Sequence, residues 1–235
     1  MHRLVLWNID QTLVDVTKVT RVAYVEAFRQ ITGRPLVQLP SMAGRSEPEV
    51  FFDALALNGV DVRDEDASER LLEPFSAALA SALAAHRDEL GMNGRMMAGA
   101  PEALAAVAGL DGAVQSVLTG SSRRNAELKL GAFGLDQYLD TTVGGYGGTD
   151  PFPKGTLLGV ARERAGEKYR VTFDHTVYVA DALSDIAAAK VGGARCVAVA
   201  SGRDSTAALR DAGAWYVLPD LTDPQRLLTA ILDFS

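Results

Sequence analysis

The stretch Leu4-Val5-Leu6-Trp7-Asn8-Ile9-Asp10-Gln11-Thr12 carries the first information about the fold. Its first four residues form a continuous apolar run that is too short for a stable helix and is typical of a buried strand in a parallel sheet. Asn8 and Asp10 follow at once, and on extended backbone two side chains at this spacing point the same way. The stretch therefore predicts a strand that presents two polar groups at its carboxyl end, although a turn gives the same pattern in isolation.

The chain from about residue 16 to residue 92 has helical patterning throughout. Apolar residues recur at helical spacing over 16–32, Ser46-Glu47-Pro48-Glu49 is typical of a helix N-terminus with a capping box, and an alanine- and leucine-rich stretch predicts a third helix over 67–89. Glycines at 91 and 94 end this part. We expect residues 16–92 to form an inserted, all-helical cap.

Strand and helix patterns alternate after residue 93. Alternation of this kind implies a parallel sheet that is covered by helices on both faces. The predicted fold is therefore an α/β, Rossmann-like three-layer core of residues 1–15 and 93–235, with the cap inserted after the first strand. Strands are expected at 113–118, 141–143, 176–180, 196–200 and 215–217, and helices at 101–108, 124–132, 154–165, 185–191, 205–212 and 224–234.

Composition narrows the range of partners. The formal net charge of −7 argues against nucleic acid or an anionic membrane, which attract basic patches, but leaves a small phosphorylated ligand open. The single cysteine, Cys196, lies in an apolar run and is expected to be a buried strand residue. No apolar stretch approaches the length of a membrane span and no secretion signal is evident, so we expect a cytoplasmic protein.

Polar residues follow several predicted strands, where open parallel sheets bind their ligands. Thr119-Gly120 offers a hydroxyl and backbone N–H groups to a phosphate oxygen, although helix capping explains the same residues. Asp181 and Asp185 lie between a strand and the next helix, as a Mg²⁺ site or as an ordinary acidic first turn. Three histidines, His2, His86 and His175, have no ligand spacing.

In this order, these segments resemble the motifs of the haloacid dehalogenase superfamily, in particular its phosphoglycolate-phosphatase-like subgroup with a helical cap. Gly134-Leu135-Asp136-Gln137-Tyr138-Leu139-Asp140 adds to the resemblance, which covers nearly the whole chain. The resemblance implies a Mg²⁺-dependent phosphomonoester hydrolase lineage that acts on a small phosphorylated metabolite. It implies catalytic roles for Asn8 at the nucleophile position, Asp10 as general acid/base and Lys154; substrate binding by Thr119, Gly120 and Arg45; and metal binding by Asn8, Asp10, Asp181 and Asp185.

The cation of the third motif has two alternative positions. Asp150-Pro151-Phe152-Pro153 occupies the register of a Lys-Pro-x-Pro motif and would place an acid there. Tyr146-Gly147-Gly148-Thr149-Asp150 followed by Lys154 is instead similar to a Tyr-Gly-x-Asp-x-x-x-Arg pattern. We favour Lys154, as the cation that neutralises phosphate charge.

The main departure from the family pattern is Asn8, which stands where the resemblance implies a nucleophilic aspartate. A neutral amide is a very poor nucleophile and a weaker Mg²⁺ ligand than a carboxylate. One hypothesis is an enzyme of this lineage with impaired activity, in which Asp10 activates water directly. The alternative is a non-catalytic, phosphate-binding pseudophosphatase. A 2-haloacid dehalogenase is disfavoured, because Asn8 counts against it too and Asp181 and Asp185 suit phosphate chemistry.

Overall fold

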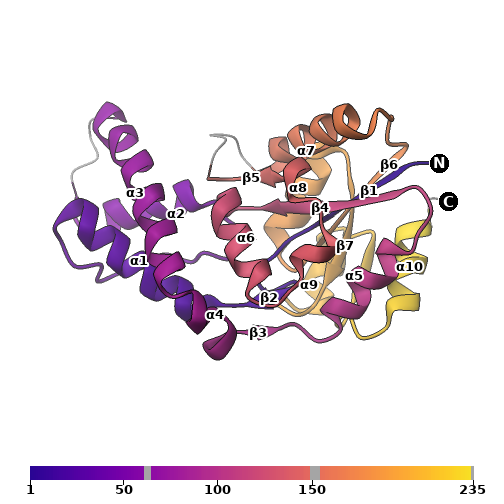
Figure 1. Ribbon diagram of the computed structural model, residues 1–235, viewed down its shortest axis with the longest axis horizontal. Coiled ribbons are helices and arrows are strands. Elements are labelled where there is room, and N and C mark those ends of the chain that lie inside the picture. The colour runs from indigo at the N-terminus through magenta and orange to yellow at the C-terminus, as the bar shows by residue number, and fades with distance from the viewer. Residues whose placement is uncertain (61–64, 149–153, 234–235) are drawn as a thin grey trace.

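A parallel sheet forms the centre of the molecule. The computed structural model describes residues 1–60, 65–148 and 154–233, and within them six strands have the order β5-β4-β1-β6-β7-β8. All their pairings are parallel. This confirms the predicted α/β class, with β1 central in the sheet (Figure 1). The strands are β1 (Arg3–Trp7), β4 (Ala113–Thr119), β5 (Gly145–Tyr146), β6 (His175–Ala180), β7 (Arg195–Val199) and β8 (Tyr216–Leu218).

Alternate residues of β1 enter two different hydrophobic cores, as the two-residue period of a strand requires. Leu4 and Leu6 belong to the core under α7 (Lys154–Tyr169), α8 (Leu183–Gly192) and α9 (Thr206–Asp211). Val5 and Trp7 belong to the core on the other face, under α5 (Ala100–Ala108), α6 (Arg123–Gly131) and α10 (Pro224–Leu232). Helices therefore cover both faces of the sheet, which is the predicted three-layer arrangement.

Four helices stand apart from the sheet, at the left of Figure 1. They are α1 (Thr17–Thr32), α2 (Glu47–Leu57), α3 (Glu65–Ala85) and α4 (Arg87–Asn93). Their packing includes the aromatic rings of Tyr24, Phe51 and Phe75, and the centroids of the last two lie 4.0 Å apart. An antiparallel ribbon of β2 (Val14–Asp15) and β3 (Arg95–Met96) lies where the chain enters and leaves these helices. We call α1–α4 the cap; its predicted boundaries, residues 16 and 92, stay a prediction.

The capping box predicted at the start of α2 is present. The Ser46 backbone N–H donates to Glu49 Oε2 at 2.7 Å, and the Glu49 N–H donates to Ser46 Oγ at 3.4 Å. The single helix predicted over 67–89 is wrong, because the chain ends α3 at Ala85 and begins α4 after His86. The His86 ring bridges Glu89 and Glu26, and these contacts hold the residue at the break.

The strand predicted over 141–143 is also wrong. Thr141–Val143 forms a 3₁₀ helix, and the edge strand lies two residues later, where Gly145 and Tyr146 pair with the end of β4. The β-branched residues favour a strand, but Asp140 accepts from both the backbone N–H and the hydroxyl of Thr142, at 3.0 and 2.6 Å. This local turn outweighs the intrinsic preference.

Two simpler expectations can be compared directly with the structure. Cys196 is buried in β7 as a free thiol, and burial raises its pKa. Within the described part of the chain, no helix is both long enough and apolar enough to cross a membrane.

Candidate functional site

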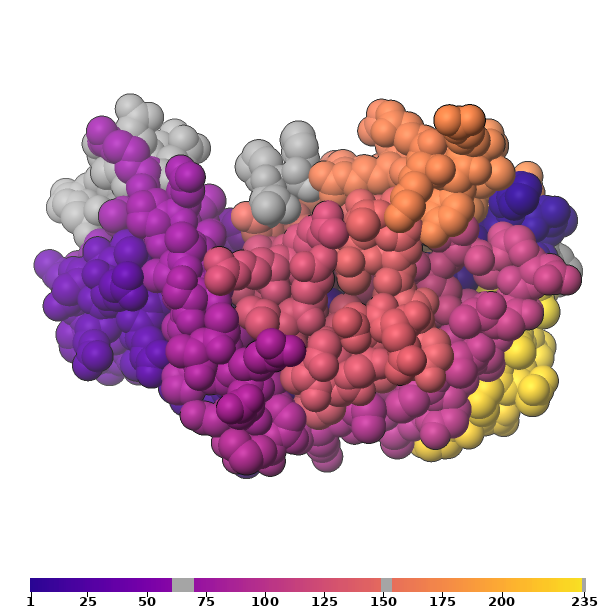
Figure 2. Space-filling model, viewed as in Figure 1, coloured from indigo at the N-terminus to yellow at the C-terminus, as the bar shows by residue number. Residues whose placement is uncertain are grey.

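A pocket of about 600 Å³ lies between the cap and the carboxyl edge of the sheet. In the space-filling view the cap, in indigo and purple, meets the rest of the molecule along a broad front (Figure 2). Seven of the eight predicted site residues line this pocket, from five separate segments of the chain: Asn8, Asp10, Arg45, Thr119, Gly120, Lys154 and Asp181. The eighth, Asp185, lies beneath Lys154 and is fully buried.

Asn8 is the first residue after β1 and is 6 % exposed. The two hydrogens of its side-chain Nδ2 face three oxygens: Asp10 O at 3.0 Å, Asp181 Oδ1 at 2.9 Å and, more distantly, Thr12 Oγ1 at 3.3 Å. Its Oδ1 accepts from Lys154 Nζ at 3.2 Å. The carboxamide therefore has partners on both ends, and it connects the residues of the first, third and fourth predicted motifs.

A tight turn returns the chain after Asn8. The backbone N–H groups of Leu13 and Val14 both donate to Ile9 O, at 2.9 and 3.1 Å. Gln11, where the family pattern has glycine, takes a left-handed backbone with φ of 64°. Non-glycine residues in this region cost about 1 kcal/mol. The Gln11 side chain donates to Asp15 Oδ1 at 2.7 Å, which helps to hold the turn.

Lys154, the first residue of α7, is 8 % exposed and lies between two acceptors. Its Nζ is 2.6 Å from Asp185 Oδ1 and 3.2 Å from Asn8 Oδ1. Asp185 also accepts from the Tyr178 hydroxyl at 3.0 Å and from the Ala182 backbone N–H at 3.3 Å. Asp185 therefore orients the lysine. The competing motif-three register at Asp150 lies outside the described residues.

Asp181, at the end of β6, is 4 % exposed. Burial raises its pKa, and the nearby Asp185 carboxylate raises it further; hydrogen bonds from Thr12 and Asn8 and the charge of Lys154 oppose the rise, which leaves the pKa at about 6. The Thr12 hydroxyl donates to Asp181 Oδ1 at 2.8 Å. The group therefore changes charge near neutral pH rather than in acid.

Lys129 is a site residue that the sequence reasoning missed. It lies on α6, is 2 % exposed, and its Nζ contacts Asp10 Oδ2 at 2.6 Å and Ser121 Oγ at 3.0 Å. It also lines the pocket. A signal was present, because Lys129 follows Ala126 by three residues and precedes Leu130, both of which are buried on the inner face of α6.

Glu47, the first residue of α2, was also missed and joins the cap to the core. Its carboxylate accepts from the Ser122 backbone N–H at 3.1 Å and from Asn125 Nδ2 at 3.0 Å, and its own N–H donates to Gly120 O at 2.8 Å. Burial raises the pKa of Glu47, while Lys129 and these hydrogen bonds oppose the rise. The N-terminus of α2 is thereby fixed to the predicted phosphate-binding turn.

The remaining predicted binding residues lie on the pocket wall. Arg45 forms an ion pair with Asp53 at 2.8 Å and donates to Glu49 O at 3.0 Å, so α2 orients its guanidinium. Thr119 Oγ1 accepts from the Ser121 N–H at 3.2 Å, as in an ordinary turn before a helix. Contact of Arg45, Thr119 and Gly120 with a ligand stays a prediction.

The Mg²⁺ ion that the resemblance implies does not fit these side chains as they lie. Asn8 directs its amide N–H groups, which cannot ligate a cation, at the oxygens of Asp10 and Asp181. Asp185 already accepts from an ammonium, a hydroxyl and a backbone N–H. Among the described residues, no three His, Cys, Asp or Glu side chains are grouped closely enough to hold a metal ion. Metal binding by Asn8, Asp10, Asp181 and Asp185 stays a prediction.

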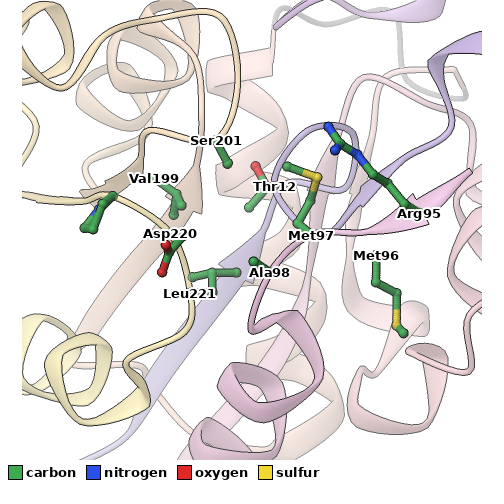
Figure 3. A pocket seen from close by; sticks show the side chains of 10 residues that line it. Thr12, Arg95, Met96, Met97, Ala98, Val199, Ser201, Asp220 and Leu221 are labelled. Atoms are coloured by element: carbon green, nitrogen blue, oxygen red, sulfur yellow. The ribbon is translucent and has the colours of Figure 1, made fainter.

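A second pocket, of about 300 Å³, is lined by Thr12 but not by Asn8. Figure 3 shows Thr12 beside Met97, with Val199, Ser201 and Leu221 across the cavity. The Thr12 hydroxyl is bonded to Asp181 and Asn8, which line the first pocket, so this threonine connects the residues of the two pockets.

The fold and this pocket together define the class of protein: a Rossmann-like α/β core that carries polar residues from several loops at the carboxyl edge of a parallel sheet, under a helical cap. The sequence model of the haloacid dehalogenase-like hydrolases matches residues 5–190, and a HAD-hydrolase-like model matches residues 158–224. The chain belongs to the haloacid dehalogenase-like hydrolase family.

The chain is also similar to individual proteins with assigned names. The chain is 27 % identical over 242 residues to a phosphoglycolate phosphatase of Pseudomonas syringae pv. tomato, with all of this chain and 82 % of that protein covered. A solved predicted phosphatase of Clostridium acetobutylicum has a TM-score of 0.70 at 17 % identity, covering 97 % and 99 % of the two chains. A solved hydrolase of Pseudomonas syringae has a TM-score of 0.64 at 23 % identity, covering 99 % and 100 %. The two structures support the fold.

Proposed function

We propose that the protein binds a small phosphorylated metabolite in the pocket under the cap. We further propose that it hydrolyses this ligand much more slowly than a site with aspartate at position 8 would, because Asn8 is a poor nucleophile. The family and its phosphoglycolate phosphatase relatives support the ligand class. The single observation that carries the loss of chemistry is the Asn8 carboxamide, which is buried at the implied nucleophile position with its Oδ1 and Nδ2 both hydrogen-bonded.

The pocket retains groups that suit a phosphate. Lys154 directs a buried ammonium at the end of β1, and Thr119 and Gly120, which line the same pocket, form the turn before α6. In the proposed complex the phosphate lies among these three residues, and the organic part of the ligand extends toward the cap. Asp10, the implied general acid/base, lines the same pocket and contacts Lys129.

An amide oxygen is a very poor nucleophile, so removal of the attacking carboxylate costs about 10⁴–10⁶ in kcat by analogy with deletions in catalytic triads. The test is release of phosphate from a panel of small phosphomonoesters by the protein and by Asn8→Asp, with Mg²⁺ present. Asn93→Asp is the matched control, because it makes the same chemical change at an exposed residue that does not line the pocket.

We expect turnover by Asn8→Asp alone, at least about 10⁴-fold above the unmodified protein, together with binding of inorganic phosphate by the unmodified protein in calorimetry. Equal turnover by the unmodified protein and Asn8→Asp would overturn the proposal and make Asp10 the next residue to test. Absence of phosphate binding by the unmodified protein would also overturn it.

A further inference from the structure

We propose that the Asn8 carboxamide takes the place of a divalent cation in this site, so that the pocket binds phosphate without Mg²⁺. This inference rests on the proposed function for its ligand, but its geometry is independent. The Nδ2 atom lies within 3.0 Å of both Asp10 O and Asp181 Oδ1, and it hydrogen-bonds them to each other through one neutral group.

The orientation of the amide follows from its neighbours. A lysine ammonium has donors only, so the Asn8 atom that faces Lys154 Nζ must be the oxygen. The nitrogen then faces the two Asp oxygens and Thr12 Oγ1. The opposite orientation would direct N–H groups at an ammonium and the amide oxygen at a carbonyl and a carboxylate, which loses these bonds and adds repulsion.

A cation therefore competes with hydrogen bonds that already exist. Mg²⁺ requires oxygens at about 2.0–2.1 Å in octahedral geometry, and an amide N–H group is not a ligand for it. To reach Asp10 O and Asp181 Oδ1 together, the ion must displace Asn8 Nδ2 and turn the buried amide away from Lys154. An aspartate at position 8 has no such N–H group and adds a negative charge that a cation neutralises.

The charge of the pocket supports anion binding without a metal. Among the described residues, the pocket is lined by six cationic and four acidic side chains, although the whole chain has a formal net charge of −7. Lys154 and Arg45 pair with Asp185 and Asp53, which lie outside the lining, yet both cations still face the pocket, where a cationic side chain attracts a phosphate without a bound metal ion. The six cations are Lys18, Arg21, Arg45, Lys129, Lys154 and Arg203.

The experiment is a Mg²⁺ titration without phosphate, in which binding is measured both by calorimetry and by the shift in melting temperature. We expect no binding heat and no shift for the unmodified protein, and both for Asn8→Asp, with Asn93→Asp behaving like the unmodified protein. Mg²⁺ binding by the unmodified protein within tenfold of Asn8→Asp overturns the inference. Absence of binding by both also overturns it, because the amide is then not what excludes the ion. If Asn8→Asp does not fold, Asn8→Ala, which removes the amide N–H groups, takes its place in the same titration.

Inorganic phosphate is then titrated in EDTA and in Mg²⁺. For the unmodified protein we expect the same Kd within twofold, whereas Asn8→Asp should bind at least tenfold more tightly with Mg²⁺. A tenfold tightening for the unmodified protein overturns the inference. If the unmodified protein binds no phosphate in either buffer, the proposed function fails, while the Mg²⁺ titration still decides the role of the amide.

Discussion

Lys129 Nζ lies 2.6 Å from Asp10 Oδ2, and the two side chains of this ion pair differ greatly in exposure, 3 % for the lysine and 41 % for the aspartate. The Asp10 carboxylate can therefore be hydrated without its partner, whereas the Lys129 ammonium cannot. The pair also joins the turn after β1 to α6, and so connects the implied general acid/base to the helix that follows the predicted phosphate-binding turn.

The first prediction follows from this asymmetry. Asp10→Ala leaves a buried ammonium with Ser121 Oγ as its remaining hydrogen-bond partner among the described residues and with the charge of Glu47 as partial compensation, which should cost about 3 kcal/mol of the free energy of unfolding. Lys129→Met leaves the Asp10 carboxylate in contact with water and Glu47 with its hydrogen-bond donors, and should cost about 1 kcal/mol. Urea denaturation of both variants measures the difference. Equal losses, or a larger loss for Lys129→Met, would contradict this account of the pair.

The second prediction compares two threonines that line different pockets. Thr20 Oγ1 is buried without a hydrogen-bond partner among the described residues, whereas Thr12 Oγ1 contacts both Asp181 and Asn8. Valine has the shape of threonine without the hydroxyl, so Thr20→Val should raise the free energy of unfolding by about 1 kcal/mol and Thr12→Val should lower it by about 2 kcal/mol. Thermal and urea unfolding check both signs. Destabilisation of similar size in both variants would show that the Thr20 hydroxyl has a partner.

Much of the fold could be predicted from strand ends and helix periods, since both depend on local sequence. The run before Asn8, the alternation after residue 93 and the capping box at Ser46 each determine a local structure with few alternatives. Thr141–Val143 could not be predicted in the same way, because a side-chain contact of Asp140 outweighs the strand preference of β-branched residues.

Some residues of the candidate site could be predicted from the sequence and others could not. Residues directly after strands, such as Asn8 and Asp181, could be predicted because parallel strands place their carboxyl ends at one edge. Lys129 and Glu47 are helix residues, and charged residues on helices are mostly solvated. Glu47 is held by contacts with the start of α6, and Lys129 by contacts with Asp10 and Ser121, which no single segment of sequence determines.

The third prediction concerns pH and the cap. Hydrogen bonds to Glu89 and Glu26 raise the pKa of His86 above its ordinary value of 6.5, against the opposing effect of desolvation. Because the folded state favours the protonated ring, this stabilisation is fully present below about pH 6.5 and is lost as pH rises through the raised pKa. His86→Gln removes the charge and keeps hydrogen-bonding groups.

The difference in free energy of unfolding between the unmodified protein and His86→Gln should therefore shrink as pH rises from about 6 to about 8. Using the difference cancels the contributions of the groups that the two proteins share. Urea unfolding at several pH values measures it. A difference that is constant with pH, or one that grows, would mean that the Glu26 and Glu89 contacts do not favour the charged ring.

The last prediction concerns Gly120, where the cap loop meets the core. A Cβ added to this glycine would lie 2.0 Å from Arg45 O and 2.9 Å from Ser46 Cα, both backbone atoms that cannot turn aside. Gly120→Ala should therefore displace the cap loop and break the hydrogen bond from Glu47 N to Gly120 O, at a cost of about 1–3 kcal/mol. Gly159→Ala is the matched control, because a Cβ at that helical position meets nothing within 4 Å and should stabilise by about 0.5–1 kcal/mol. Urea unfolding shows whether each variant lowers or raises the free energy of unfolding. Hydrogen exchange at the Glu47 amide should accelerate in Gly120→Ala only. If that amide remains as protected as in Gly159→Ala, the cap loop does not rest on Gly120.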